Sequence, residues 1–198
     1  ILPIGHWVLG MACAQLMAWS RNPATAHLSV AVNVSALQFK QPDYVSQVVS
    51  VIERSGINPA LLKLELTESM LVNDVHDIIL KMHALKAKGV GLSLDDFGTG
   101  YSSLSYLKKL PLDQLKIDQS FVRDMLTDAN DVAIVQTLVA LGQAMHLHVI
   151  AEGVETEQHR QFLADMGCHS YQGYLLSKPL PIAEFDAMLS AHEASLTS

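Results

Sequence analysis

The sequence predicts an α/β protein whose parallel strands form a (β/α) barrel of the TIM-barrel type, and three observations favour this fold. Short apolar segments alternate with helical segments along all 198 residues. The apolar segments begin at intervals of about 25–35 residues, the size of a βαβ repeat. A polar residue ends or directly follows each apolar segment, and in a barrel these positions converge on one rim. An open doubly wound sheet also fits the alternation but would spread these residues along a wide edge.

The apolar segments are predicted to be strands. They are short, rich in Leu or β-branched residues and nearly free of polar breaks, as expected for a parallel sheet that is covered on both faces. In chain order they cover residues 28–34, 61–66, 90–94, 114–117, 148–151 and 170–175.

Helices are predicted between these strands, where apolar residues recur every three or four positions. The clearest covers residues 74–88, and Asn73 or Asp74 can cap its start while Gly89 can end it. Further helices are predicted at residues 131–145, 157–166 and 183–189. The composition does not shift along the chain and no Gly/Ser-rich linker divides it, so residues 1–198 are expected to form a single domain.

The composition favours a globular domain with a large core, since apolar residues make up 49% and charged residues 17% of the chain. The 13 basic and 20 acidic residues give a net charge of −7, which disfavours binding to a nucleic-acid duplex. A phosphate ligand can still bind where acidic residues hold divalent cations. The two cysteines, Cys13 and Cys168, cannot form a disulfide scaffold and fit a reducing, cytoplasmic setting.

Oxygen donors gather at the predicted rim of the barrel. They include no Cys or His, and an all-oxygen site suits Mg²⁺, Mn²⁺ or Ca²⁺. Carboxylates this close would repel one another unless cations neutralise them. The donors are Asn33, Glu65, Asp95, Asp96 and Glu152, and Lys116 and Gln172 occupy the equivalent positions of the remaining strands.

Each of these residues also has a simpler interpretation. Asp95 and Asp96 can be a solvated strand end or a helix cap, because neighbouring strand residues point to opposite faces and both can serve one site only at the loop boundary. Lys116 can be an exposed edge residue, although an unpaired Lys is costly in a sheet buried on both faces. The Gly-rich segment 97–103 can be a plain turn or a mobile lid. Glu68 can cap the next helix or hold that segment through Thr or Ser hydroxyls.

Six motifs in order make the sequence resemble the EAL-domain family of bacterial cyclic di-GMP phosphodiesterases. The resemblance covers essentially the whole chain. The motifs are Asn33-Val-Ser, Glu65-Leu-Thr-Glu-Ser, Asp95-Asp-Phe-Gly-Thr-Gly-Tyr-Ser-Ser, Leu115-Lys-Ile-Asp, Ile150-Ala-Glu-Gly-Val-Glu and Gln172-Gly-Tyr.

The resemblance implies a variant TIM barrel with one antiparallel strand and hydrolysis of cyclic di-GMP to linear pGpG. It implies that the five oxygen donors bind two Mg²⁺ or Mn²⁺ ions, that Lys116 and Gln172 lie beside the nucleophilic water and its hydrogen-bond network, and that Glu68 anchors a loop. Glu155 matches the second acid of the Glu-Gly-Val-Glu motif, which supports the site. By family analogy a homodimer is expected, and the parent protein can carry sensory or cyclase-like domains.

One departure from the family pattern is that no Glu-Ala-Leu tripeptide occurs in the chain. In the family this motif precedes the segment that matches residues 1–5, and it supplies a metal-binding Glu and a neighbouring Arg that contacts the ligand. We therefore expect a fragment that lacks about two barrel strands and is less active than an extended domain. Catalytically silent members act as cyclic di-GMP receptors or protein-interaction modules. Their metal ligands are usually substituted, whereas every covered ligand position here is filled, which favours catalysis.

Overall fold

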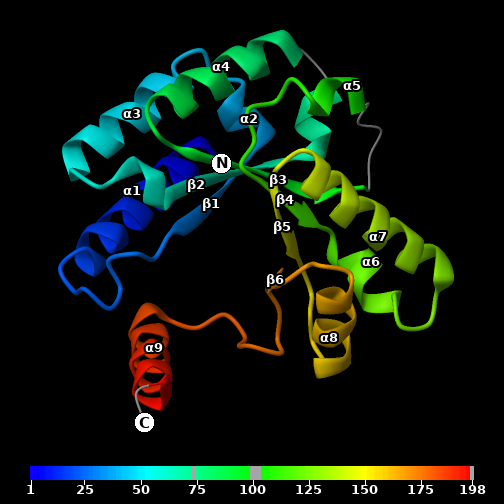
Figure 1. Ribbon diagram of the computed structural model, residues 1–198. Coiled ribbons are helices and arrows are strands. Elements are labelled where there is room, and N and C mark those ends of the chain that lie inside the picture. Colours follow the sequence, from blue (N-terminus) through cyan, green and yellow to red (C-terminus); the bar gives the residue numbers. More distant parts are fainter. Residues whose placement is uncertain (73–74, 99–103, 197–198) are drawn as a thin grey trace.

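The computed structural model describes residues 1–72, 75–98 and 104–196 and contains a six-stranded sheet in the order β1-β2-β3-β4-β5-β6. Every neighbouring pair is parallel, and helical segments connect successive strands (Figure 1). Sequential parallel pairing is the topology of a (β/α) barrel, so the predicted fold class is confirmed. Within the described ranges the sheet does not close, and β1 and β6 form its two edges. The strands are β1 (Val30–Val34), β2 (Leu62–Thr67), β3 (Gly91–Phe97), β4 (Gln114–Ile117), β5 (His148–Ala151) and β6 (Ser170–Tyr171).

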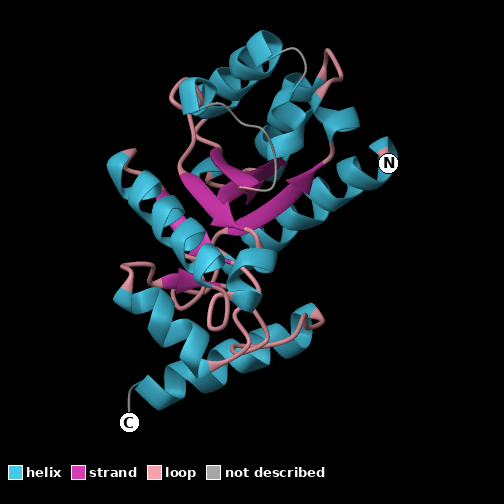
Figure 2. Ribbon diagram, turned by 90° about the vertical axis from the view of Figure 1, so that its right-hand side faces the viewer, coloured by secondary structure: helices cyan, strands magenta, loops and turns pink. Residues whose placement is uncertain are grey.

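Helices cover the outer face of the sheet, and the C-terminal helix stands apart from them (Figures 1 and 2). That last helix is joined to the first by Trp19, whose Nε1 donates to Asp186 Oδ1 at 2.9 Å and whose ring lies 5.8 Å from that of Phe185. The helices are α1 (Leu2–Trp19), α2 (Ala36–Phe39), α3 (Tyr44–Ser55), α4 (Val75–Ala87), α5 (Leu104–Leu107), α6 (Gln119–Asp124), α7 (Ala129–Ala144), α8 (Glu157–Asp165) and α9 (Ile182–Leu196), with the 3₁₀ turns η1 (Pro59–Leu61) and η2 (Glu68–Val72).

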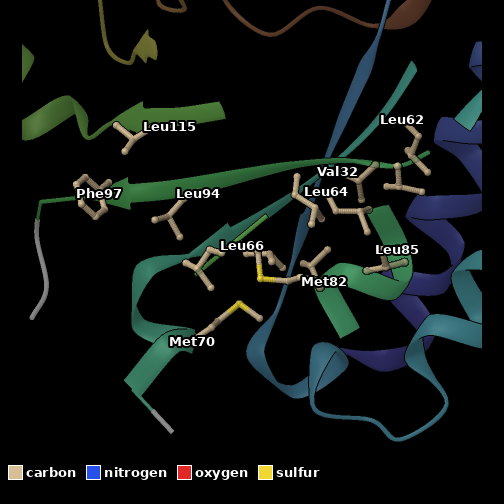
Figure 3. Packing of buried hydrophobic residues seen from close by; sticks show 14 of the residues in the cluster. Val32, Leu62, Leu64, Leu66, Met70, Met82, Leu85, Leu94, Phe97 and Leu115 are labelled. Carbon is tan, nitrogen blue, oxygen red and sulfur yellow. The ribbon is translucent and has the colours of Figure 1, made fainter. Parts of the chain in front are cut away.

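The hydrophobic core lies between the sheet and the outer helices. Leu62, Leu64 and Leu66 of β2 pack with Met82 and Leu85 of α4 (Figure 3). None of the five is more than 1% exposed, and burying each such side chain contributes about 1.5–3 kcal/mol. This packing fixes which face of β2 turns outward.

The inner face of the sheet is polar. Neighbouring residues of a strand face opposite sides, so Lys63 and Glu65 of β2 turn away from the outer helices. The same alternation places Ser93 of β3 and both Gln114 and Lys116 of β4 on the inner face, beside outward-facing leucines. The side chains that can perform chemistry are therefore inside the curve of the sheet.

The sequence predicted β4 and β5 with the bounds that the structure has, and β1 and β2 to within two residues at each end. The predicted strand at residues 170–175 was too long, since β6 ends at Tyr171. A Cβ on Gly173 would lie 2.2 Å from the Val154 carbonyl oxygen, so here the chain packs against the loop after β5. Val154 N donates to Gln172 O at 3.1 Å and Leu175 N donates to Val154 O at 3.0 Å, which fixes the backbone on both sides of Gly173.

The predicted helix ends agree with the local geometry where they are described. Gly89 and Gly167 follow α4 and α8 with φ of 87° each, a conformation that glycine adopts without strain. The capping role predicted for Asn73 or Asp74 falls outside the described residues. The predicted helix at residues 183–189 was too short, because α9 covers Ile182–Leu196, and α3 was not predicted.

No helix in the described parts of the chain combines the length and the apolar character that crossing a bilayer requires.

Candidate active site

Lys116 lies at the centre of the polar rim. Its Nζ is 2.9 Å from Glu65 Oε2, 3.0 Å from Asp95 Oδ1 and 2.6 Å from Glu152 Oε1. The four residues come from β2, β3, β4 and the residue after β5, so neighbouring parallel strands deliver all of them to one end of the sheet. Lys116 is only 3% exposed, which excludes the interpretation of an exposed edge residue.

A backbone irregularity brings Asp95 and Asp96 to the same place. The predicted end of the strand at residue 94 was wrong, because both aspartates lie within β3. The pairing of β3 with β4 shifts register between Leu94 and Phe97, and Asp96 has a φ of 55°. A left-handed residue at such a shift breaks the alternation of side chains, at a cost of about 1–3 kcal/mol that is characteristic of functional sites.

The irregularity completes a group of carboxylates. One oxygen from each of Asp95, Asp96 and Glu152 lies within 4.8 Å of the other two, the only such group of acidic, His or Cys side chains found in the described ranges. With Glu65, which joins them through Lys116, these residues form what we call the carboxylate cluster.

Burial and repulsion between like charges make it costly for the carboxylates of this cluster to be ionised together. Burial raises the pKa of the Asp96 carboxyl, and the neighbouring charges of Asp95 and Asp118 raise it further. Burial also raises the pKa of Glu152, although Lys116 opposes that effect. Burial acts against the Lys116 ammonium, but the hydrogen bonds that it donates to Glu152 and Glu65 more than offset this effect and raise the Lys116 pKa. The cluster therefore holds four carboxylates, three of which contact the Lys116 ammonium.

The donor set fits a divalent cation. Mg²⁺ binds oxygens at about 2.0–2.1 Å, so two ligand oxygens of one ion lie about 3–4 Å apart, and the spacing in the carboxylate cluster needs little adjustment to match. Asp95, Asp96 and Glu152 supply oxygens only, the donors that Mg²⁺ and Mn²⁺ prefer. A cation there would also relieve the excess negative charge.

Gln172 and Glu155 flank the cluster on the β5–β6 side. Gln172 Nε2 donates to Glu152 Oε1 at 2.7 Å, so Glu152 is held by both Gln172 and Lys116. A cleft of about 780 Å³ opens beside them, lined among others by Glu152, Glu155, Gln172, Tyr174 and Lys178. Glu155 is exposed in this cleft and does not enter the cluster.

Glu68 holds the start of the Gly-rich segment. It begins η2, is 4% exposed, and its Oε2 accepts a hydrogen bond of 3.0 Å from Gly98 N. The sequence predicted Thr or Ser hydroxyls as its partners, and those at residues 99–103 lie outside the described residues. A backbone amide is one partner of Glu68 within the described residues.

Asn33 lies at the edge of the polar rim, beside Glu65. It lies on the edge strand β1, opposite Glu65 in the register, with an exposed side chain. It can join a ligand set from this position only on the side of the cluster nearest Glu65.

Asp118 belongs to the site but was not singled out from the sequence. Its Oδ1 accepts from Ser120 N at 2.9 Å at the start of α6, and its side chain is hydrogen-bonded to Asp96. The available signal was its position two residues after Lys116, which places both near the same end of β4.

Comparison with known proteins gives the family of this chain. Residues 1–179 match the EAL domain family. The chain is 45% identical over 190 residues to the bifunctional diguanylate cyclase/cyclic di-GMP phosphodiesterase MucR of Pseudomonas aeruginosa, covering 96% of this chain and 28% of MucR. It is 42% identical over 189 residues to the cyclic di-GMP phosphodiesterase NbdA of the same organism, covering 96% of this chain and 24% of NbdA.

A solved structure shows the same fold. A c-di-GMP complex of the PaMucR phosphodiesterase superposes with a TM-score of 0.89 at 45% identity, covering 92% of this chain and 74% of that one. The chain spans about a quarter of the length of the curated relatives it matches. On the matched residues, the shared fold and the identities, this chain belongs to the EAL domain family.

Proposed function

We propose that this chain is the phosphodiesterase domain of its parent protein and hydrolyses one phosphodiester bond of cyclic di-GMP to give linear pGpG. The observation that carries the proposal is the convergence of Asp95, Asp96 and Glu152 within 4.8 Å, on the strand ends that also hold Lys116. The names of MucR and NbdA and the c-di-GMP complex of MucR support this substrate.

Two Mg²⁺ or Mn²⁺ ions are the proposed cofactors, held by Asn33, Glu65, Asp95, Asp96 and Glu152. Divalent cations in such a site neutralise phosphate oxygens and make water more acidic. The residues of the chain do the positioning. Gln172 keeps Glu152 oriented, Lys116 offsets negative charge and orients a water beside the phosphate, and Glu68 fixes the Gly98 backbone.

The proposal extends to the other domains of the parent protein, its location in the cell and its oligomeric state. The parent protein carries further domains, a cyclase-like one among them, as the name of MucR indicates for that relative. We place the reaction in the cytoplasm, where the buried free thiols of Cys13 and Cys168 stay reduced. A homodimer through the helices after β3 and β4 is proposed on family analogy alone.

The test is incubation with cyclic di-GMP and chromatography of the products. The 198-residue chain and a version extended by about 60 preceding residues of its parent, roughly two βα units, are assayed with Mg²⁺, with Mn²⁺ and with excess EDTA. We expect pGpG only with metal, and more from the extended version. Turnover that persists in EDTA would contradict the proposal, and saturable binding of cyclic di-GMP without product would assign the domain as a silent receptor.

Removing the hydrogen bond between Glu68 and Gly98 should weaken metal binding. In Glu68→Ala the Gly98 amide loses this acceptor, so the backbone at Gly98 loosens beside Asp95 and Asp96. Groups that only orient a metal ligand typically contribute about 10–100-fold, and we expect the Mg²⁺ concentration for half activity to rise about 10-fold. Glu68→Gln, which keeps an acceptor oxygen, should stay within about threefold of the wild type by this argument. An unchanged Mg²⁺ titration in Glu68→Ala would leave Glu68 only a capping role.

A further inference from the structure

A second polar layer lies on the inner face of the sheet, beneath the carboxylate cluster. Lys63 Nζ donates to Gln114 Oε1 at 2.9 Å, and Gln114 Nε2 donates to Ser93 Oγ at 3.1 Å. Ser93 and Gln114 are 0% and 2% exposed, so the layer is built into the interior. It draws one residue from each of β2, β3 and β4.

The chain makes room for Lys63. To reach β4, its side chain crosses the neighbouring strand at Gly91, the residue opposite it in the register. A Cβ at Gly91 would lie 2.9 Å from Lys63 Cγ, closer than two carbons can approach. Gly91 does not have a positive φ, so the space for Lys63, rather than backbone conformation, accounts for this glycine.

This layer lies two residues earlier along each strand than the residues of the candidate site. Lys63, Ser93 and Gln114 precede Glu65, Asp95 and Lys116 by two residues each. Two residues of a parallel strand span about 6.6 Å, so the Lys63 ammonium is within the range of strong Coulomb interaction with the cluster. In the described parts of the chain Lys63 forms no ion pair within 4.0 Å, and its charge is not cancelled by an adjacent carboxylate.

We infer that Lys63 is a positioning residue of the metal site, whose ammonium, held by Gln114 under Glu65, offsets part of the carboxylate charge and sets how tightly the cluster takes a divalent cation. This inference rests on the proposed function. Lys63 touches neither metal nor substrate and acts through the field at Glu65 and Asp95. Removing the Lys63 charge makes the electrostatic potential at the carboxylate cluster more negative, so cations bind there more tightly.

The experiment is calorimetric titration of Mn²⁺ into the 198-residue chain without substrate. Lys63→Met should lower the Kd for Mn²⁺ by about 3- to 10-fold at low ionic strength, and the difference should shrink in 0.5 M salt. Lys63→Arg keeps the charge and should stay within about twofold of the wild type. Ser93→Ala removes a hydrogen bond of the layer but no charge, and should lower Tm without changing the Kd.

The possible outcomes distinguish a failure of the inference about Lys63 from a failure of the proposed function. Normal Mn²⁺ binding by the wild type with an unchanged Kd in Lys63→Met overturns this inference and leaves the function standing. The same Kd change in Ser93→Ala as in Lys63→Met also overturns it, since the effect would then be structural. A wild type that binds no Mn²⁺ overturns the proposed metal site and this inference together. If Lys63→Met does not fold, Lys63→Gln carries the same comparison.

Discussion

Asp95→Asn is expected to abolish turnover of cyclic di-GMP while the metal-free protein stays folded and at least as stable as the wild type. The substitution removes one carboxylate charge from the group that holds the proposed ions. Groups that merely orient metal ligands contribute about 10–100-fold, so losing a ligand should cost at least about 100-fold in rate. Steady-state assays at saturating Mg²⁺ would measure this loss.

The stability of the metal-free Asp95→Asn protein should not fall with its turnover, because the carboxylate cluster holds more negative than positive charge. The Asp95 carboxylate is one of three that contact Lys116, and two remain after its removal. The like-charge repulsion that helps to raise the pKa of Asp96 is then reduced. Metal-free Tm should therefore hold or rise. Asp124→Asn, an exposed carboxylate paired with Arg123 on α6, is the control and should change neither quantity. Near-normal turnover in Asp95→Asn would refute its assignment as a ligand.

Much of the fold could be predicted because local pattern decides it. β4 and β5 are short segments rich in Leu, Ile and Val, and the structure gives them the predicted bounds. The omission of α3 was avoidable, since Tyr44, Val48, Val51 and Ile52 recur at helical spacing and Gly56 ends the helix with a φ of 70°. The end of β6 was not predictable in this way, because it depends on contact between Gly173 and the distant Val154.

The candidate site was predicted in composition but not in arrangement. The residue types at the strand ends indicated an oxygen-donor site, and those assignments remain predictions. The sequence held no sign that Asp96 adopts a positive φ inside β3, since a non-glycine residue there costs energy that only surrounding structure can offset. Nor could it show that Lys116 contacts three carboxylates, because those pairings join strands far apart in sequence.

Lys116→Met should produce the largest loss of stability in the metal-free protein. It leaves Glu65, Asp95 and Glu152 without their shared counter-charge in an interior position. Removing one partner of a buried ion pair typically costs about 3–5 kcal/mol, and we expect a loss of this size in denaturant unfolding with EDTA present. Turnover should also be lost, because Lys116 is the cation nearest the proposed reacting groups.

Two conditions should restore stability to Lys116→Met, and both follow from charge. A divalent cation that binds only the folded state at 100 times its Kd adds about 2.7 kcal/mol. Lowering the pH should reduce the difference in unfolding free energy between Lys116→Met and the wild type. Without Lys116 the pKa of Glu152, already raised by burial, rises further above its unfolded value of about 4.3. The folded variant then holds more protons than the unfolded one, so its stability falls as pH rises through that window and returns as pH falls.

The matched control for this prediction is Lys81→Met. Lys81 of α4 is also buried, donates to Phe39 O at 2.9 Å and pairs with Asp77 at 2.8 Å, but it lies away from the carboxylate cluster. Its removal should destabilise the protein, and Mn²⁺ should stabilise this variant only as much as it stabilises the wild type, because the carboxylate cluster is the same in both. If Mn²⁺ adds equal stability to Lys116→Met, Lys81→Met and the wild type, the cation and the Lys116 ammonium do not compete for the same oxygens. If it adds more to Lys116→Met than to the other two, the same oxygens that hold the ammonium also hold the metal, and the ammonium is what keeps the empty site folded.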